Sequence, residues 1–228
     1  PELSTARVLT SELATGARFD ELLTWDDEER QLAAEAIYRF VFRSLYRLQA
    51  FNGDPHPGNY LFRPGGQVTF LDFGLVKHFT ADEIKVFQRM IEAIVLDRDV
   101  ATYRRIAEEI GLLKPGLPVS DEQVEEYFGH FYSFVAEDAV MTITPEWSSQ
   151  TVQRFFDPTG PHGEIAKAAN LPASFVIIQR INLGLMAILG DLRATANFRQ
   201  IAEELWPWVD RPPTTEMGRA EAEWLEGR

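Results

Sequence analysis

The sequence contains no cysteine, and this absence excludes several kinds of site at once. None of its 228 residues can form a disulfide, a zinc–thiolate centre or a thiol nucleophile. Positive charge is also scarce, because 22 lysines and arginines stand against 35 acidic residues and give a net charge of −13. A nucleic-acid binder needs clustered positive charge. The composition therefore argues against a nucleic-acid partner and fits a cytoplasmic protein.

The sequence also lacks a secretory leader and a long apolar run. Its first residues, PELSTAR, have neither the basic start nor the apolar segment of a signal peptide. The most apolar stretch, residues 173–190, is interrupted by Gln179, Arg180 and Asn182. A spanning helix needs about 20 apolar residues. We therefore expect a buried helix there, and a soluble chain.

The chain is organised around residues 51–74, FNGDPHPGNYLFRPGGQVTFLDFG. Asn59 follows Asp54 by five positions, and Asp72 opens an Asp-Phe-Gly tripeptide. Two apolar runs around the RPGG turn signal predict a β-hairpin with Asn59 at its entrance and Asp72 at its exit. Phosphoryl transfer needs a carboxylate beside the attacking hydroxyl and oxygen ligands for magnesium on the nucleotide phosphates. This order of groups is typical of protein kinases.

Each of these residues has a predicted role and an ordinary alternative. Asp54 is the candidate catalytic carboxylate, which accepts or orients the proton of an attacking hydroxyl or water. Asn59 and Asp72 are the candidate magnesium ligands. For all three the alternative is turn or strand-end chemistry. His56 is a second candidate catalytic residue. It either contacts the transferred phosphate or the metal site, or braces the loop between two prolines, and the two alternatives have equal weight.

The sequence DPHPGN at residues 54–59 resembles the signature of the UbiB/AarF family of atypical, protein-kinase-like kinases and ATPases, which assist quinone lipid metabolism. Weaker similarity runs from about residue 7 to about residue 205. The resemblance implies ATP and magnesium as cofactors, with phosphoryl transfer from ATP or ATP hydrolysis linked to isoprenoid-quinone or lipid metabolism. It also implies three candidate partners: a lipid, a quinone-pathway protein and a membrane surface. The expected location is cytoplasmic, with a peripheral membrane location as a further candidate.

The resemblance also implies a nucleotide-binding hinge near the start of the chain. The β-prone run Arg7–Thr10 would end an N-terminal lobe, and the following residues would hold adenine. The Glu12 carbonyl and the Ala14 amide would face the adenine edge, with Ser11 guarding the back of the pocket. The alternative is an ordinary strand followed by a turn at Gly16.

Leu61 and Gly74 complete the predicted cofactor site. By resemblance, Leu61 is the apolar residue that packs under adenine, and its alternative is a core residue of the strand. Gly74 allows the backbone turn after Asp72. The phosphate-covering loop, the strand lysine and the lysine-x-glycine-glutamine segment that such enzymes also use do not occur in this sequence. We therefore expect a hinge plus a C-terminal lobe that is inactive alone, with activity in a longer parent protein.

The rest of the sequence predicts helices. Residues 26–50 have helical periodicity, and capping signals at Thr80-x-x-Glu83, Asp99 and Ser120 open three further helices. More helices are expected at residues 149–156, 163–169, 172–189 and 194–206, with a loop at residues 157–161. The predicted fold is mainly α with a small antiparallel β-hairpin (α+β), a protein-kinase-like C-terminal lobe. Its predicted parts are residues 1–17 (end of an N-lobe strand and hinge), 18–210 (C-lobe, with catalytic loop 51–59 and DFG 72–74) and 211–228 (polar tail).

One basic row has two interpretations. Arg39, Arg43 and Arg47 recur every four residues on one face of the helix predicted at residues 26–50. They predict a solvated face paired with Glu35, and contact with lipid phosphates is the alternative.

The residues after DFG bear on the substrate. No Ala-Pro-Glu tripeptide follows, and the helix at Thr80 begins almost at once, which leaves hardly any room for an activation loop. This favours a small-molecule or lipid substrate, or plain ATP hydrolysis, over a protein substrate. Two alternatives remain: a small-molecule phosphotransferase of the aminoglycoside or choline type, and a non-catalytic nucleotide-sensing scaffold.

Overall fold

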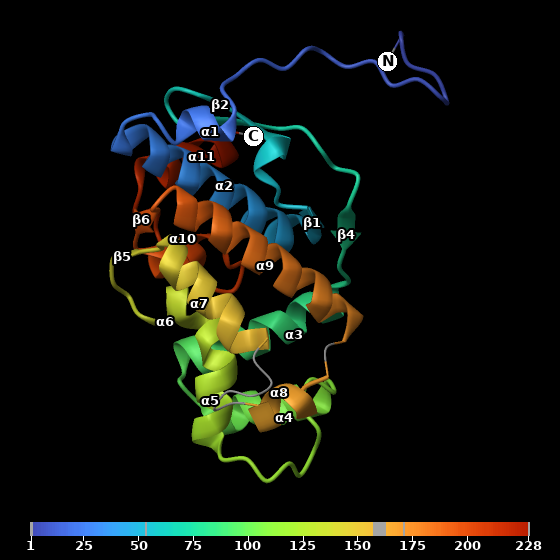
Figure 1. Cartoon of the computed structure of the whole chain (residues 1–228), viewed down its shortest axis with the longest axis vertical. Coiled ribbons are helices and arrows are strands. Elements are labelled where there is room, and N and C mark those ends of the chain that lie inside the picture. Colours follow the sequence, from blue (N-terminus) through green and yellow to red (C-terminus); the bar gives the residue numbers. More distant parts are fainter. Residues whose placement is uncertain (1, 53, 157–162, 171, 228) are drawn as a thin grey trace.

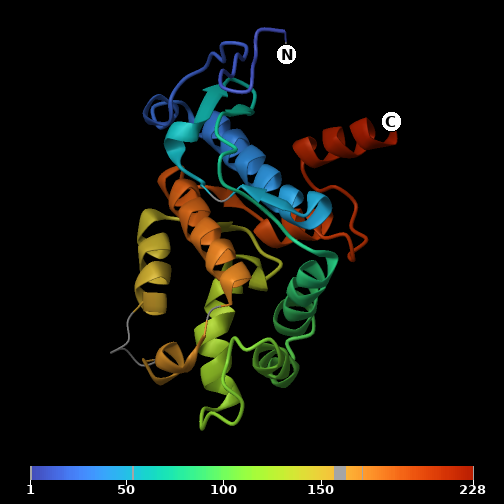
Figure 2. The same ribbon diagram turned by 90° about the vertical axis from the view of Figure 1, so that its right-hand side faces the viewer.

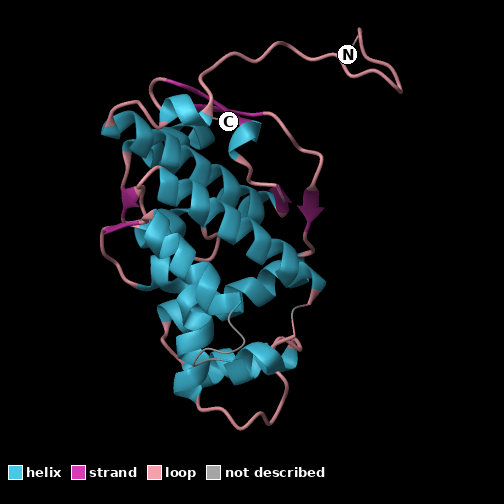
Figure 3. Cartoon of the chain, in the orientation of Figure 1, coloured by secondary structure: helices cyan, strands magenta, loops and turns pink. Residues whose placement is uncertain are grey.

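The computed structural model of the protein describes residues 2–52, 54–156, 163–170 and 172–227. Helices dominate it, and the strands form three small two-stranded antiparallel sheets (Figure 3). The expected mainly α class with a small antiparallel β component is therefore confirmed. The molecule is elongated, and both chain ends lie at the same end of it as the β2–β3 hairpin (Figures 1 and 2).

The long helix α2, Asp27–Leu48, is the centre of the fold and follows the short helix α1, Phe19–Leu22. The Asp26 carboxylate accepts a hydrogen bond from the Glu29 amide at 2.9 Å, so the helix begins with a side-chain cap. It ends at Gln49, which adopts the left-handed conformation with φ of 54°. The predicted helix is confirmed, two residues shorter than expected at its C-terminal end.

The predicted hairpin is confirmed. Strand β2, Tyr60–Arg63, pairs with β3, Gln67–Phe70, and the register joins Tyr60 to Phe70. Gly65 and Gly66 in the turn have φ of 77° and 69°, a conformation that favours glycine. The Gly65 amide donates to the Glu29 carboxylate at 2.7 Å, which fastens the turn to the start of α2.

The expectation of helices alone after Gly74 is wrong, because three short strands lie there. Strand β1, Ala50–Asn52, pairs with β4, Val76–His78. Strand β5, Met141–Thr142, pairs with β6, Thr195–Ala196. These strands are two or three residues long, so they give too few alternating positions for a periodic signal.

The capping signals are confirmed. The amides of Glu83, Thr102 and Gln123 donate to the side chains of Thr80, Asp99 and Ser120 at 3.2, 2.9 and 3.2 Å. The helices after β4 are α3 (Ala81–Ile91), α4 (Val100–Glu109), α5 (Asp121–Phe128), α6 (Ser133–Ala136), α7 (Pro145–Phe156), α8 (Gly163–Ala168), α9 (Ala173–Asp191), α10 (Phe198–Leu205) and α11 (Glu216–Glu226). A π-helical turn, Glu92–Leu96, extends α3, and a 3₁₀ turn, Gly129–Tyr132, separates α5 from α6. The loop predicted at residues 157–161 lies outside the described residues.

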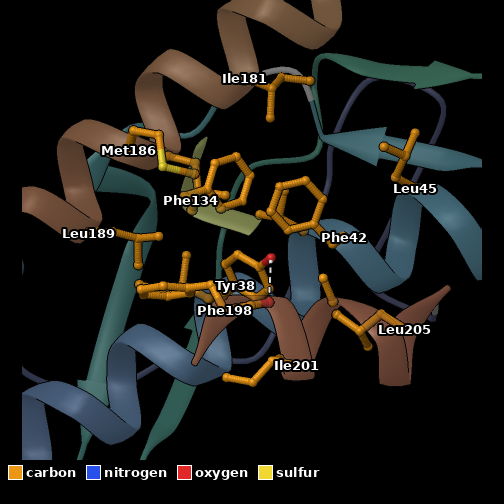
Figure 4. Packing of buried hydrophobic residues seen from close by; sticks show 14 of the residues in the cluster. Tyr38, Phe42, Leu45, Phe134, Ile181, Met186, Leu189, Phe198, Ile201 and Leu205 are labelled. Carbon is orange, nitrogen blue, oxygen red and sulfur yellow. Dashed lines mark hydrogen bonds between the residues drawn. The ribbon is translucent and has the colours of Figure 1, made fainter. Parts of the chain in front are cut away.

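The main core lies where α2, α9 and α10 meet (Figure 4). Tyr38 of α2 packs against Phe42 and Phe198, with ring centroids 4.7 and 5.3 Å apart. Its hydroxyl donates to the Phe198 carbonyl at 3.4 Å. From α9, Ile181 and Leu189 are fully buried, so the helix expected at residues 173–190 is confirmed, although it buries one face and leaves Val176 and Arg180 exposed. No helix in the described part of the chain is both long and apolar enough to cross a membrane.

The arginine row of α2 is only partly solvated, which corrects the sequence interpretation. Arg39 is 5% exposed; the predicted pair with Glu35 exists at 2.7 Å, but a second pair joins Arg39 to Glu204 of α10 at 2.6 Å. Arg43 pairs with Glu221 of α11. The third arginine of the row stays exposed and donates to the backbone of α10. Helices α10 and α11 therefore cover most of this face, and the tail is a helix held to α2 by charge.

Candidate functional site

The ladder between β1 and β4 closes the base of the predicted site. It pairs Asn52 with Val76, so the chain leaves the helical body and returns to it at the same point. The Asn52 side-chain amide donates to the Asp72 carbonyl at 2.8 Å, and its amide oxygen accepts from the Asp54 amide at 3.3 Å. Asn52 thus ties the two halves of the site together, a role that the sequence analysis did not foresee.

Asp54 and Asn59 contact each other directly. The Asn59 Nδ2 donates to the carbonyl oxygen of Asp54 at 3.3 Å and to its carboxylate Oδ2 at 3.4 Å. A 3₁₀ turn, Pro57–Asn59, brings the two residues together, and the Leu71 amide donates to the Asn59 carbonyl at 2.9 Å. Because Nδ2 faces Asp54, the amide oxygen of Asn59 is the atom left to bind a metal ion.

Asp72 lies exposed where the hairpin returns toward the ladder. Its Oδ1 accepts from the Gly74 amide at 2.7 Å, and a Cβ on Gly74 would lie 3.0 Å from the same oxygen. Gly74 therefore lets the backbone approach the carboxylate closely at a bend.

The donor chemistry of the site fits magnesium. In the described residues, no three or more histidine or acidic side chains cluster as a complete metal cage. Magnesium bound with a nucleotide typically uses one or two carboxylates together with phosphate oxygens, so a complete protein cage is not needed. The carboxylate of Asp72 and the amide oxygen of Asn59 are ligands of the right kind.

His56 braces the loop. Its Nδ1 accepts from the Gly58 amide at 3.0 Å, and a Cβ on Gly58 would meet the same ring atom at 3.0 Å. Of the two alternatives raised by the sequence, this geometry shows the bracing contact. His56 is also exposed to solvent.

Arg180 of α9 reaches the site from the other side. Its Nη2 lies 3.3 Å from the Asp54 Oδ1, although the two residues are 126 positions apart. Four residues further along α9, Gly184 packs against Pro55. The sequence showed Arg180 only as an interruption of an apolar helix, and that interruption was the one signal that could have identified it.

A groove of about 690 Å³ runs beside the catalytic loop. The end of the segment predicted to be a hinge forms one wall, and backbone hydrogen bonds of 2.8 and 2.9 Å between Ala17 and Phe62 hold it to β2. Ala14 and Leu61, both predicted to contact adenine, line this groove together, whereas the exposed Ser11 does not line it. The remaining lining residues are Thr15, Gly16, Arg18, Phe19, Asp20, Pro57, Gly58, Tyr60 and Leu71.

The predicted strand at Arg7–Thr10 is wrong. Thr5 and Val8 instead close a tight turn through a single bridge, and the chain from there to Gly16 forms no strand or helix. Glu12 is exposed along this stretch and, like Ser11, lies outside the groove lining. A strand needs a neighbour to satisfy its backbone groups, and residues 7–10 pair with no other strand in the described chain.

Tyr60 sits under the catalytic loop as a neutral phenol. Burial, and to a smaller extent the negative charge of Asp54, raise the pKa of Tyr60 to about 12. The side chain is 3% exposed and packs edge-on against Phe70 at 5.3 Å between ring centroids. It therefore supports the loop from the hairpin rather than serving as an acid or base at neutral pH.

Comparison with known proteins finds sequences similar to this chain. Residues 1–107 match the ABC1 atypical kinase-like domain. An aarF domain-containing protein kinase of Arabidopsis thaliana, described as uncharacterized and chloroplastic, is 30% identical over 114 residues, which cover 50% of this chain and 16% of the relative. The chloroplastic protein Activity of BC1 Complex Kinase 3, also of A. thaliana, is 26% identical over 121 residues, 52% of this chain and 17% of the relative. The chain therefore spans about a sixth of the length of these relatives.

One solved structure has a similar fold. The complex of Rv3197 with erythromycin, from Mycobacterium tuberculosis, superposes with a TM-score of 0.68 and 24% sequence identity. The match covers 86% of this chain and 48% of the other. The likeness extends well beyond residue 107, so the helices after the matched domain belong to the same fold.

Proposed function

We propose that this chain is the catalytic and magnesium-binding lobe of an ATP-dependent phosphotransferase or ATPase, because residues 1–107 match the ABC1 atypical kinase-like domain and the DPHPGN sequence resembles the UbiB/AarF signature. The observation that carries the proposal is that Asn52 joins Asp54 to Asp72 while Asn59 contacts Asp54. The Asn52 side chain bonds to the backbones of both aspartates, and the side-chain amide of Asn59 donates to the Asp54 carboxylate. Two loop segments separated by a hairpin thereby present oxygen ligands at one edge.

The proposed chemistry gives each residue one task. Asp54 orients the acceptor hydroxyl or water and takes its proton. Asn59 and Asp72 hold magnesium, which would supply charge neutralisation at the phosphate oxygens of ATP. His56 keeps the loop rigid through Gly58, and Leu61 lines the groove where the adenine lies.

The nature of the acceptor follows from the residues after DFG. Strand β4 occupies Val76–His78, and Thr80 caps α3 immediately afterwards. An activation loop that could dock a peptide has no space between these elements. We therefore propose a small or lipid acceptor, or water. The family resemblance supports a link to isoprenoid-quinone or lipid metabolism, a cytoplasmic location, and a membrane surface or quinone-pathway protein as partner.

A small-molecule phosphotransferase of the aminoglycoside or choline type is the second candidate, because it shares the Asp-x4-Asn loop. The similar solved structure contains erythromycin, a small molecule. An acceptor screen separates the candidates: stoichiometric phosphorylation of an amino sugar or choline would favour the second one.

Calorimetric titration of the natural full-length protein with ADP and ATP, with and without magnesium, tests the proposal. We expect magnesium-dependent binding that Asp72→Asn removes. Asp54→Asn should keep the binding but reduce phosphate release or transfer by a factor of about 100 or more, as the loss of a general base does. Asp210→Asn, which changes an exposed aspartate after α10, is the matched control and should resemble the wild type.

Two outcomes would contradict parts of the proposal. Binding that Asp72→Asn leaves intact would remove the metal assignment. Nucleotide binding without turnover, unchanged by Asp54→Asn, would instead support a nucleotide-sensing scaffold.

A further inference from the structure

The guanidinium of Arg180 is placed to serve two anions. Its Nη2 donates to Asp54 Oδ1 at 3.3 Å, and its side chain is 62% exposed, while that of Asp54 is 42% exposed. A guanidinium carries five N–H donors in a planar fork that suits carboxylates and phosphates. The contact with Asp54 uses one of them. Because most of the Arg180 side chain remains exposed, donors are left over for a second anion.

The position of Arg180 is set by packing and does not depend on the ion pair alone. Ile181 and Leu185 on α9 are fully buried, which fixes the rotation of the helix. Gly184, one turn after Arg180 and therefore on the same face, lies against Pro55 so closely that a Cβ would come within 2.6 Å of Pro55 Cγ. The packing of α9 thus places the backbone of Arg180 beside the catalytic loop.

The catalytic loop itself supplies no permanent cation. Residues 54–59, DPHPGN, contain no lysine or arginine. The one titratable base among them, His56, is engaged with Gly58 through Nδ1. The transition state of phosphoryl transfer spreads negative charge over the three oxygens of the moving group, and a fixed cation there stabilises it. Arg180 contacts Asp54, so on the proposed mechanism it lies beside the place where that charge would develop.

We propose that Arg180 contacts the terminal phosphate of bound ATP while its pairing with Asp54 keeps that carboxylate beside the same phosphate. This inference rests on the proposed function. In the step it serves, the acceptor oxygen bonds to the terminal phosphorus as the bond from phosphorus to the bridging oxygen breaks. The electron pair of the broken bond leaves with ADP, and the acceptor proton passes to Asp54. Arg180 neither gives nor takes a proton.

The first test compares two nucleotides. The magnesium complexes of ADP and of an ATP analogue with a non-hydrolysable imido bridge are titrated into the natural full-length protein and its Arg180→Gln variant. Loss of one charge-assisted contact to the terminal phosphate should weaken binding of the analogue about tenfold and leave that of ADP unchanged. Arg180→Lys should retain part of the difference. Arg105→Gln, which removes the same charge from an exposed position on α4, should change neither affinity.

Equal weakening of the binding of both nucleotides would show a structural role and overturn the inference. Unchanged binding of both nucleotides would also overturn it.

The second test is chemical rescue. Arg180→Ala should lower kcat more than it raises KM for ATP, and added guanidinium ion should restore part of the lost rate. Absence of rescue in a variant with wild-type thermal stability would count against the phosphate contact.

The failure of this inference can be distinguished from the failure of the proposed function. An inactive Asp54→Asn variant beside a fully active Arg180→Gln variant would leave the function standing and remove Arg180 from it. A fully active Asp54→Asn variant would remove both.

Discussion

Gly184 of α9 and Pro55 of the catalytic loop are in such close contact that a Cβ on the glycine would lie 2.6 Å from Pro55 Cγ. The next residue after Gly184, Leu185, is fully buried in the main core. The contact therefore seats the catalytic loop on a helix that cannot retreat without disrupting the core. The loop gains a rigid support from a part of the chain more than a hundred residues away.

Gly184→Ala should destabilise the protein. In an exposed helix this change would add about 1 kcal/mol of stability. Here the added methyl group overlaps a proline ring, and overpacking of this kind costs about 1–3 kcal/mol. We expect a net loss in the free energy of unfolding, measured by urea denaturation, together with weaker magnesium-dependent nucleotide binding.

Gly129→Ala is the matched control for this change. A Cβ there would meet its nearest neighbour, Glu125 Cγ, at 3.7 Å, an ordinary van der Waals distance. Its stability should equal or slightly exceed that of the wild type. A Gly184→Ala protein more stable than the wild type would show that the loop moves freely away from α9.

Arg39→Met should destabilise the fold far more than Arg43→Met. Arg39 and its partner Glu204 have side chains that are each 6% exposed, so removing the cation leaves a buried carboxylate without its charge partner. Such a change typically costs about 3–5 kcal/mol. Arg43 is 29% exposed at its side chain and pairs with Glu221, so its loss should cost about 1 kcal/mol or less.

Limited proteolysis independently measures how firmly α11 is held to α2. Because Arg39 and Arg43 both hold Glu221 of α11, either variant should expose the segment around that helix to cleavage. Equal stability of the two variants in urea would contradict the importance of the buried pair.

Asp138 should make the stability fall at acid pH. Hydrogen bonds from the side chains of Asn197 and then Gln200, each 2.7 Å long, hold the pKa of this carboxyl below its ordinary value of 3.8. A lowered pKa in the folded state means that the group stabilises the fold above pH 3.8 and loses this contribution as the pH falls through the folded-state value. Asp138→Asn should therefore flatten the acid limb of a plot of Tm against pH.

Gln200→Ala removes one of the two donors and offers a check on the cause. It should reduce the acid dependence in the same direction, by less than Asp138→Asn does. An acid limb unchanged in both variants would show that other carboxyl groups dominate it.

Much of the candidate site could be predicted because it is local in sequence. Asp54, Asn59 and Asp72 lie within one 24-residue stretch, 51–74, and a hairpin of standard chemistry brings its two ends together. Capping signals such as Thr80 with Glu83 act over three residues and were equally readable. The roles of these site residues in catalysis and metal binding remain predictions.

What could not be predicted depends on distant contacts. Helical periodicity shows that Arg39 and Arg43 share a face, but the carboxylates that cover it come from Glu204 and Glu221, more than 160 residues later. The contact of Arg180 with Asp54 spans 126 residues. Spacing rules describe neighbours along a helix or strand and carry no information about such pairings.

The ladder of β1 and β4 has a consequence for how the site can change. It joins Ala50 to His78 and Asn52 to Val76, so the described residues 54–75 lie between two strands that are paired with each other. The entropy of closing such a loop grows only with the logarithm of its length. Lengthening the hairpin turn should therefore cost little closure entropy, although it would disturb the contact of Gly65 with Glu29 of α2. Opening the ladder should instead move Asp54 away from Asp72. The geometry of the candidate site thus depends on β1 and β4, two strands of three residues each.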